Sequence, residues 1–594
     1  MCGIGGMLGN PDIAVAQRMN QLQYHRGPDG QNVWSDERVA FAHTRLAIVD
    51  VHGSQQPIHG SKERTLIVNG EIYNHRQLRS NVKHYPFTTS GDSEVILALH
   101  DRFLASGQQR PTASDHASWL EQLDGMFAIA LWDGLNQQLI LARDSLGIKP
   151  LVKTQVEGTL LFASEVKALR ADERHVPKLD EVALAARMVW EYPLDATTLL
   201  KGVTQVHPGT VETWELNDDG EAFMSGRATI RQQIVSPEPS WNPATQAPVL
   251  LDSFVSSVQQ RLMADVPVGI VLSGGLDSSL VAAVAQEAAS RAEQPVPECW
   301  TVAESEDNPD WKAAELVASH FDLRHHQHIL EPDAFERALP NLIWHGEDID
   351  VTVLFFQPLF ETMAEKVKVG LCGQGADELH AGYPRYRDLT QHAHLLRQRL
   401  RSLPPTVQTS LEEGPLTEDD GWFSPHQRPE EQAKDLDTFL QFELDHGQLS
   451  NFQLRLVDRH SMAHSLEVRV PFLGAPHLNA ANRLPMEWRL PSSMEEKAAL
   501  REAANLTGLP KEIVRRPKMP AGRATSPTML QTFLNEFSSE TEQLVAKYER
   551  LSPVFKGQSE LALGLGLFES MHLIEGGRVK RVGDVSTLLS EVLP

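Results

Sequence analysis

The stretch VPVGIVLSGGLDSS, residues 266–279, decides the fold of the larger part of this chain. Its apolar run VPVGIVL is typical of a buried strand, and LDSSLVAAVAQEAASRA (276–292) has the pattern of a helix. Between them lies Ser273-Gly274-Gly275-Leu276-Asp277-Ser278-Ser279. Glycines allow a close backbone approach, and hydroxyls and amides at a helix N-terminus bind anions. We therefore expect an anion-binding loop rather than a serine-capped turn, although the P-loop pattern GxxxxGK[ST] is missing.

The pattern of strand, loop and helix then repeats. Apolar strands are expected at 298–303 and 325–330, with helices at 308–321 and from about Asp333 to His345. The strand VKVGLCG (367–373) leads into another helical run. This alternation predicts a parallel, doubly wound sheet, whose ligands bind at the carboxyl ends of the strands.

A second loop, Gly373-Gln374-Gly375-Ala376-Asp377-Glu378, follows the strand at 367–373. Asp277 and Asp377 are then expected at the same edge of the sheet. Each aspartate alone is best explained as a cap or turn residue. Together they are a pair for Mg²⁺ carried with the phosphates of a nucleotide.

The N-terminal part has a different pattern. Short β-type runs separated by turns occur at 38–50, 65–74, 126–144 and 159–165, and the third predicts a hairpin around Gly134 and Asn136. We expect a largely antiparallel sheet system over residues 1–215. Pro, Ser and polar residues without a sustained period predict a linker over 216–248, and the second region then covers 249–594.

Composition limits the partners and the compartment. The chain has 594 residues, three cysteines and 79 acidic against 54 basic residues, a formal charge of −25. Such a surface repels nucleic acid and anionic lipid, and three cysteines make no disulfide framework. No secretory signal precedes the first strand, and no apolar run reaches the ~18 residues of a membrane helix. We expect a cytoplasmic protein that acts on small molecules, without nucleic acid or membrane partners; its oligomeric state stays open, with a homodimer as the candidate.

Cys2 follows the initiator methionine. A small residue at this position lets Met1 be removed, which leaves a thiol beside a free α-amino group. That amine titrates well below a lysine, so it can accept the thiol proton during an attack. The alternative is an unremarkable terminal residue, and Cys2 alone does not distinguish the two.

Several motifs resemble known families. SGGLDSS is similar to the pyrophosphate loop of ATP pyrophosphatases. The motifs MCGI, HRGPDG (25–30), HTRLAIVD (43–50), NGEIYN (69–74) and SGDSE (90–94) resemble class II glutamine amidotransferases. Together with DRHSMAHSLEVRVPFL (458–473), the chain resembles glutamine-hydrolysing asparagine synthetases over nearly its whole length. The resemblance implies an N-terminal-nucleophile αββα sandwich followed by a doubly wound ATP-pyrophosphatase domain, an α+β and an α/β part.

The resemblance also implies the residues of a glutaminase site. Cys2 attacks the side-chain amide of glutamine, and Asn69 and the amide of Gly70 form the oxyanion hole. The remaining residues implied to bind glutamine are Arg45 at the α-carboxylate, the segment Leu46, Ala47, Ile48 and Val49, and Glu71 and Asp92 near the ammonium group. Ammonia then passes inside the protein to a second site.

At the second site ATP adenylates an acceptor carboxylate, and AMP and pyrophosphate are released. The resemblance implies an ATP site made of Leu272, Ser273, Gly274, Gly275, Asp277, Ser278, Ser279, Val302, Cys372 and Gly373. It assigns Mg²⁺ to Asp277 and Asp377, and transition-state charge to Lys518. Lys497 matches a family lysine too, but its helical spacing also fits a solvated face.

The acceptor pocket departs from the family pattern. Thr352, Phe355 and Gln374 are implied to line it, but asparagine-forming members usually have an arginine where Phe355 stands and a glutamate where Gln374 stands. We expect an acceptor other than aspartate, an apolar or bulkier carboxylic acid, unless Arg385 or Arg387 replaces the arginine. The alternative function is a ligase or cyclase that uses another amine, with a vestigial glutaminase.

Overall fold

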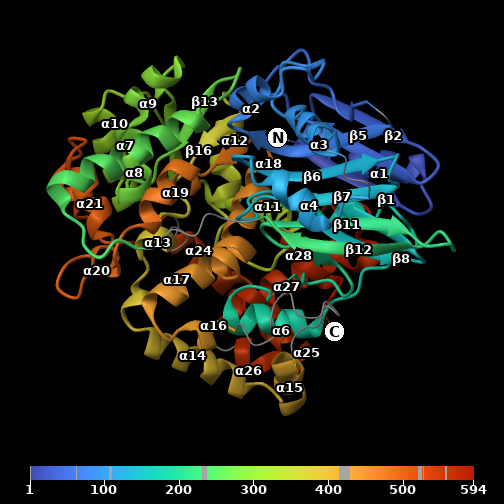
Figure 1. Cartoon of the computed structure of the whole chain (residues 1–594). Coiled ribbons are helices and arrows are strands. Elements are labelled where there is room, and N and C mark those ends of the chain that lie inside the picture. The colour runs from blue at the N-terminus through green and yellow to red at the C-terminus, as the bar shows by residue number, and fades with distance from the viewer. Residues whose placement is uncertain are drawn as a thin grey trace.

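The computed structural model describes residues 2–61, 63–105, 107, 110–194, 196–230, 237–413, 428–519, 525, 527–555 and 558–593 (Figure 1). In these residues no helix has both the length and the apolar character that crossing a membrane requires. The N-terminal region, coloured from blue to green, contains two sheets, and the remainder, coloured from green to red, contains a third sheet and most of the helices.

The first two sheets have six strands each, and all neighbouring strands are antiparallel. The first sheet has the order β10 (Thr204–Gln205), β8 (Val152–Val156), β9 (Thr159–Ala163), β1 (Cys2–Leu8), β3 (Val39–Arg45) and β2 (Gly30–Ser35). The second has the order β12 (Ala222–Thr229), β11 (Thr210–Leu216), β7 (Gln138–Arg143), β6 (Gly125–Asp133), β5 (Arg64–Ile72) and β4 (Ile58–His59). The hairpin expected around Gly134 and Asn136 is confirmed by the pairing of β6 with β7.

Apolar side chains from the two sheets face each other. Ile4 and Phe162 of the first sheet share one buried cluster with Trp132 and Leu141 of the second. Helices cover the two outer faces: α1 (Ile13–Leu22), α5 (Val166–Leu169) and α6 (Glu181–Trp190) pack on the first sheet, and α2 (His75–Asn81), α3 (Val95–Leu104) and α4 (Ala113–Leu120) on the second. This arrangement confirms the αββα sandwich.

The linker expected over 216–248 needs correction. Strand β12 lies inside it and pairs with β11 at the edge of the second sheet. Helix α7 (Pro243–Arg261) begins inside it too, with Asn242 as the N-cap and Pro243 in its first turn. The polar composition concealed an edge strand, whose outward side chains need not be apolar. Residues 231–236 of this segment lie outside the described part of the chain.

The third sheet is parallel throughout, with the order β15 (His325–Ile329), β14 (Glu298–Ala303), β13 (Val268–Val271), β16 (Val369–Leu371) and β17 (Glu467–Arg469). Helices α8 (Leu276–Ala283), α9 (Ala285–Ala292), α10 (Pro309–His320), α11 (Pro332–Gly346) and α12 (Phe356–Ala364) alternate with these strands. The doubly wound sheet is therefore confirmed. The helix expected over 276–292 is divided at Val284, and β17 was not predicted.

Most of the remaining chain is helical. The helices are α13 (Ala376–His380), α14 (Leu389–Ser402), α15 (Pro405–Glu413), α16 (Pro429–Gln432), α17 (Leu436–Asp445), α18 (Leu454–Met462), α19 (Ala475–Asn482), α20 (Met486–Arg489), α21 (Ala498–Asn505), α22 (Lys511–Val514), α24 (Pro527–Glu536), α25 (Ser538–Lys547), α26 (Ser552–Phe555), α27 (Ser559–His572) and α28 (Val585–Ser590). A π-helix, Leu449–Gln453, directly precedes α18. Helix α27 shares a buried cluster with α6, so the C-terminal helices pack against the N-terminal sandwich (Figure 1).

Candidate functional site

Cys2 begins the first strand of the sandwich and lies beside Arg45 in the register of β1 with β3. Only 7% of Cys2 is exposed, and its nitrogen lies 3.2 Å from the Oδ1 atom of Asn69 on β5. Burial raises the pKa of the thiol, while the charge at the chain start and the backbone N–H of Leu46 oppose this rise. A thiol whose pKa is raised needs a base beside it, and the α-amino group exposed by removal of Met1 is one.

Asn69 and Gly70 lie side by side on β5. The Asn69 Nδ2 atom is 3.5 Å from the Oγ atom of Ser164, which also accepts from the backbone N–H of Ile4 in β1. At Gly70 a Cβ atom would lie 2.0 Å from the carbonyl oxygen of Met126 on the neighbouring strand. Only glycine therefore fits at this position.

The Arg45 guanidinium closes the loop that follows β3. It donates to the carbonyl oxygens of Val51 at 2.9 Å and Asp50 at 2.8 Å. The segment Leu46, Ala47, Ile48 and Val49 follows directly, and the N–H of Ala47 donates to Asp29 at 2.7 Å. Leu46, Ile48 and Val49 pack on a cluster that includes Ala264, Val369 and Met462. This segment therefore lies between the sandwich and the parallel sheet.

Two buried acids lie near Cys2. Asp92 accepts from the backbone N–H of Ile72 at 2.7 Å, and burial raises its pKa. Burial, and then the charges of Asp92 and Glu467, raise the pKa of Glu71 well above its ordinary value. Arg469 of β17 lies 3.7 Å from Glu71 and opposes this rise. Acids of this kind can take up the ammonium group of an amino-acid ligand.

The loop 273–279 connects β13 to α8 as expected. The Oγ atom of Ser278 accepts from the N–H of Ser273 at 3.1 Å. The hydroxyls of Ser273 and Ser278 also share a hydrogen bond of 3.0 Å, in which either can be the donor. Gly274 has φ +70°, and a Cβ there would lie 2.6 Å from the backbone nitrogen of Ala314. Gly275 caps α8, and Ser279 lies in its first turn with a buried hydroxyl. Hydrogen bonds between Ser273 and Ser278 thus join the two ends of the loop.

The residues expected around adenine and at the second loop lie on adjacent strands. The carbonyl oxygen of Leu272 accepts from the hydroxyl of Thr301 at 2.5 Å, and Val302 is the next residue on β14. Cys372 follows β16, and its N–H donates to the backbone carbonyl oxygen of Arg469 at 3.0 Å. At Gly373 a Cβ would lie 2.9 Å from the backbone nitrogen of Ser278. The two loops therefore contact each other.

Asp277 and Asp377 converge, and two lysines lie between them. Lys497 Nζ is 2.6 Å from Oδ1 of each aspartate. Lys518 Nζ is 2.5 Å from Asp377 and 3.6 Å from Asp277. Burial opposes the charge of Asp377, but Lys497 and then Lys518 outweigh it and lower its pKa. Burial also opposes the charge of Lys518, but Asp377 and then Asp277 outweigh it and raise its pKa.

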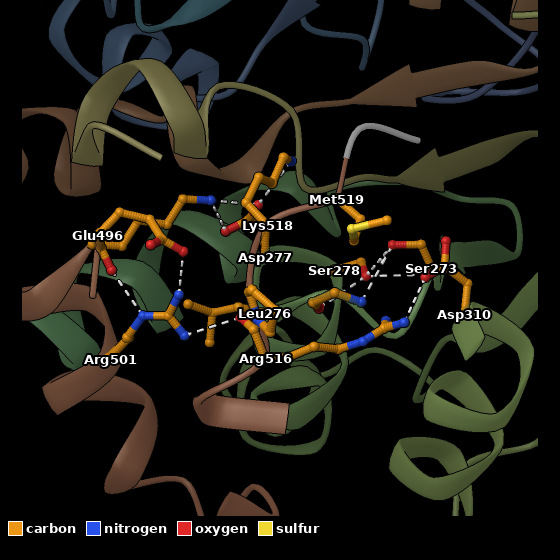
Figure 2. A pocket seen from close by; sticks show the side chains of 13 residues that line it. Ser273, Leu276, Asp277, Ser278, Asp310, Glu496, Arg501, Arg516, Lys518 and Met519 are labelled. Carbon is orange, nitrogen blue, oxygen red and sulfur yellow. Dashed lines mark hydrogen bonds and ion pairs between the residues drawn. The ribbon is translucent and has the colours of Figure 1, made fainter. Parts of the chain in front are cut away.

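Asp277 and the two lysines line one pocket, and Asp377 pairs with both lysines from outside its lining. Figure 2 shows Asp277 and Lys518 with Ser273, Ser278 and Met519 to one side and Glu496 with Arg501 to the other. Arg516 reaches Asp310 at 2.7 Å across the mouth of the loop. The pocket thus joins a glycine and serine loop, three carboxylates and four cations. This is the chemistry of a polyphosphate site.

The sequence fits two hypotheses for Lys497, a lysine that matches the family or a residue on a solvated helix face. The structure buries it, with 2% exposed, and the backbone at Lys497 has φ +60° as the cap of α21. Helical spacing could not reveal this, because Lys497 precedes the helix rather than lying on it.

The two aspartates fit a divalent cation. In the described part of the chain no group of three or more His, Cys, Asp or Glu side chains is arranged to hold a metal. Two carboxylates are enough for an ion that takes its other ligands from phosphates and water. The ammonium group of Lys497 between Asp277 and Asp377 indicates that their shared space favours positive charge.

The residues expected at the acceptor are not among those that line this pocket. Thr352 donates to Asp350 through its N–H at 2.8 Å and its hydroxyl at 2.6 Å. Phe355 is 5% exposed and packs on Phe356, with ring centroids 4.6 Å apart. Gln374 donates to Gln453 of the π-helix, and Gln453 donates to the hydroxyl of Tyr383 at 2.8 Å. Sequence patterns gave no sign of Gln453 or Tyr383.

The two arginines that could replace the missing family arginine both have partners of their own. Arg385 pairs with Glu443, and its guanidinium lies 4.3 Å from the ring centre of Tyr383. Arg387 donates to the carbonyl oxygens of Pro491 at 3.1 Å and Met494 at 2.9 Å.

Comparisons with known proteins agree with this arrangement. Residues 1–223 match the family model of a glutamine amidotransferase domain, and residues 249–558 match that of asparagine synthase. Asparagine synthetase B [glutamine-hydrolyzing] of Escherichia coli is 32% identical, over 68% of each chain. Asparagine synthetase [glutamine-hydrolyzing] 1 of Bacillus subtilis is 27% identical, over 87% of this chain and 86% of its own. Asparagine synthetase [glutamine-hydrolyzing] 2 of Arabidopsis thaliana is 30% identical, over 82% and 72%. The chain belongs to the asparagine synthase family and is an asparagine-synthetase-like glutamine amidotransferase.

Proposed function

We propose that the chain hydrolyses glutamine at Cys2, carries the ammonia to the ATP site and amidates an acceptor carboxylate there. Glutamine, ATP, water and the acid give glutamate, AMP, pyrophosphate and the amide. The glutaminase region ends with β12 in this proposal, and the synthetase region begins with α7. The observation that carries the proposal is that one chain holds both a buried Cys2 beside Asn69 and a pocket lined by the loop 273–279, carboxylates and lysines.

The glutaminase assignment rests on the surroundings of Cys2. Asn69 lies against its nitrogen, and the neighbouring Gly70 can only be glycine. An oxyanion hole made of these two residues would stabilise the tetrahedral intermediate. Arg45 suits the α-carboxylate of glutamine, and Glu71 and Asp92 suit its ammonium group.

Ammonia would cross between the regions where apolar side chains meet. Leu46 and Ile48 follow Arg45 and pack with Ala264, Val369 and Met462. Val369 begins β16, the strand that leads to Gln374 and Asp377. An apolar route would let neutral ammonia pass while keeping water away from the adenylate.

At the second site the loop 273–279 would hold the pyrophosphate part of ATP. Asp277 and Asp377 would hold Mg²⁺, which neutralises phosphate charge when it is bound. Lys497 and Lys518 now lie between these carboxylates. We infer that they move toward the phosphates as the cation enters, and that Lys518 then faces the charge that develops on the α-phosphate.

The acceptor site favours an acid other than aspartate. Free aspartate brings an ammonium and a second carboxylate, and each would need a partner of opposite charge. Phe355 is buried among apolar groups, while Gln374 and Gln453 offer neutral amides. Arg385 and Arg387 already have their own partners. We propose a bulkier or less charged carboxylic acid.

A ligase or cyclase that uses another amine remains the alternative function. A vestigial glutaminase is expected to lose its nucleophile, and this chain keeps Cys2 in a shaped site. The test follows glutamate and pyrophosphate together in a panel of carboxylic acids that includes aspartate. Equal amounts of both products with an acceptor support the proposal, and pyrophosphate without glutamate supports the alternative.

A further inference from the structure

A buried arginine holds the carbonyl group of the nucleophile. Arg26, with 0% exposed, donates from Nε to the carbonyl oxygen of Cys2 at 3.2 Å. Its Nη1 donates to Glu165 at 2.9 Å and its Nη2 to Asp458 at 2.8 Å. Glu165 belongs to the sandwich, but Asp458 lies on α18 of the synthetase region. One of the two counter-ions of Arg26 therefore comes from the other half of the chain.

This contact matters because an N-terminal residue is weakly held. After removal of Met1, Cys2 is attached through a single peptide bond. Its nitrogen then has Asn69 at 3.2 Å, and its carbonyl oxygen has Arg26 at 3.2 Å. The two contacts fix the direction of the amine and of the thiol, and a displacement of about 1 Å in such a group costs about a hundredfold in rate.

The ion pairs around Arg26 limit the positions that its guanidinium can take. Asp458 also accepts from Lys149 at 3.3 Å, and Lys149 is fully buried. Glu165 already accepts from His25 at 3.0 Å and from Lys167. Without the charge on Asp458, Arg26 would be drawn toward Glu165, away from its present position. Burial opposes the charge of Arg26, but Asp458 and Glu165 outweigh it and raise its pKa.

We propose that Asp458 is a positioning residue for glutamine hydrolysis, whose carboxylate holds Arg26 against the carbonyl oxygen of Cys2. The inference rests on the proposed role of Cys2 as the nucleophile. Helix α18 begins immediately after Gln453, which bonds to Gln374 in the loop beside the nucleotide loop. The helix that carries Asp458 is thus continuous with the π-helix that contacts Gln374.

The test measures glutamate release by the full chain, without ATP, for the wild type and Asp458→Asn. The matched control is Asp348→Asn, because Asp348 is equally buried and joins the two regions through Arg187 at 3.1 Å and Arg455 at 2.7 Å. We expect Asp458→Asn to lower kcat by about tenfold or more with KM nearly unchanged, since the loss concerns the nucleophile and not the substrate contacts. The control should keep the wild-type kcat.

A double variant separates positioning from a general structural role. If Asp458 acts through Arg26, Arg26→Gln with Asp458→Asn should be no slower than Arg26→Gln alone. Losses that multiply, or a wild-type kcat in Asp458→Asn, would overturn the proposal. If Asp458→Asn does not fold, Arg26→Lys keeps the buried charge but cannot reach all three acceptors. It should show the same loss in kcat, and a wild-type kcat there would also overturn the proposal. A wild type that releases no glutamate contradicts the proposed function instead.

Discussion

Replacing Asp377 with asparagine tests the charge balance at the ATP site. Asp277, Asp377 and Lys497 are buried, and together with the partly exposed Lys518 they form a set with two negative and two positive charges. Asp377→Asn leaves one positive charge in excess. Breaking one partner of a buried ion pair costs about 3–5 kcal/mol, a large part of the ~5–15 kcal/mol that keeps a protein folded. We expect a loss of about 3 kcal/mol in the free energy of unfolding.

The measurement is equilibrium unfolding in urea for four proteins: wild type, Asp377→Asn, Lys497→Met and the double variant. Lys497→Met leaves one negative charge in excess, whereas the double variant is balanced again. The double variant should therefore lose less free energy of unfolding than the two single variants lose together, by about 1 kcal/mol or more. Losses that simply add would refute the shared-charge reasoning.

The same variant should lose the binding of MgATP. In the wild type, MgATP should raise Tm because it binds the native state. In Asp377→Asn one of the two proposed carboxylate ligands is gone, so the rise should be small, while glutamate release stays at the wild-type rate. A full rise in Tm would contradict the assignment of Asp377 to the cation.

Three further predictions concern other parts of the molecule. Gly70→Ala should lower the rate of glutamine hydrolysis by a factor of about 10²–10³, because a Cβ there would lie 2.0 Å from the Met126 carbonyl oxygen and displace an oxyanion donor. Ammonia-dependent synthesis measures whether the second site is spared. Burial opposes the charge of Glu347, but Lys167 and Arg459 outweigh it and lower its pKa from 4.5 to about 2. The charged Glu347 therefore stabilises the folded protein fully above pH 4.5, and this stabilisation is lost as the pH falls toward 2. This contribution is about 3 kcal/mol, so Glu347→Gln should flatten the fall of Tm with pH in that range, and parallel curves would contradict it. With ammonia and ATP in excess, pyrophosphate release should be slow with aspartate and faster with a bulkier carboxylic acid; aspartate turnover near the enzyme median of ~10 per second would show that Phe355 does not exclude it.

Much of the fold could be predicted because each sheet leaves a periodic signal. The loop 273–279 lies between the strand and helix that its flanking runs indicate. Edge strands are harder to predict. The exposed residues of β12 include Phe223 as well as Ser225 and Thr229, so its sequence has no clear alternation. Strand β17 is only Glu467–Arg469, far in sequence from its neighbour β16. A short strand of charged residues is recognisable only once its partner is known.

The site residues divide in the same way. Cys2, Asp277 and Asp377 lie in compact motifs, so their approximate location followed from sequence. The burial of Lys497 did not follow, because it depends on two loops that meet from distant parts of the chain. Arg26 and Asp458 are 432 positions apart, and local patterns carry no information about such a contact.

The most direct test of two coupled sites in one chain is Cys2→Ala assayed with both nitrogen sources. Pyrophosphate release is measured with the best acceptor of the acid panel, once with glutamine and once with ammonia. We expect the variant to lose release that depends on glutamine and to keep the wild-type rate with ammonia, because the thiol acts only at the first site. Equal loss with glutamine and ammonia, or unchanged release with glutamine, would contradict the account.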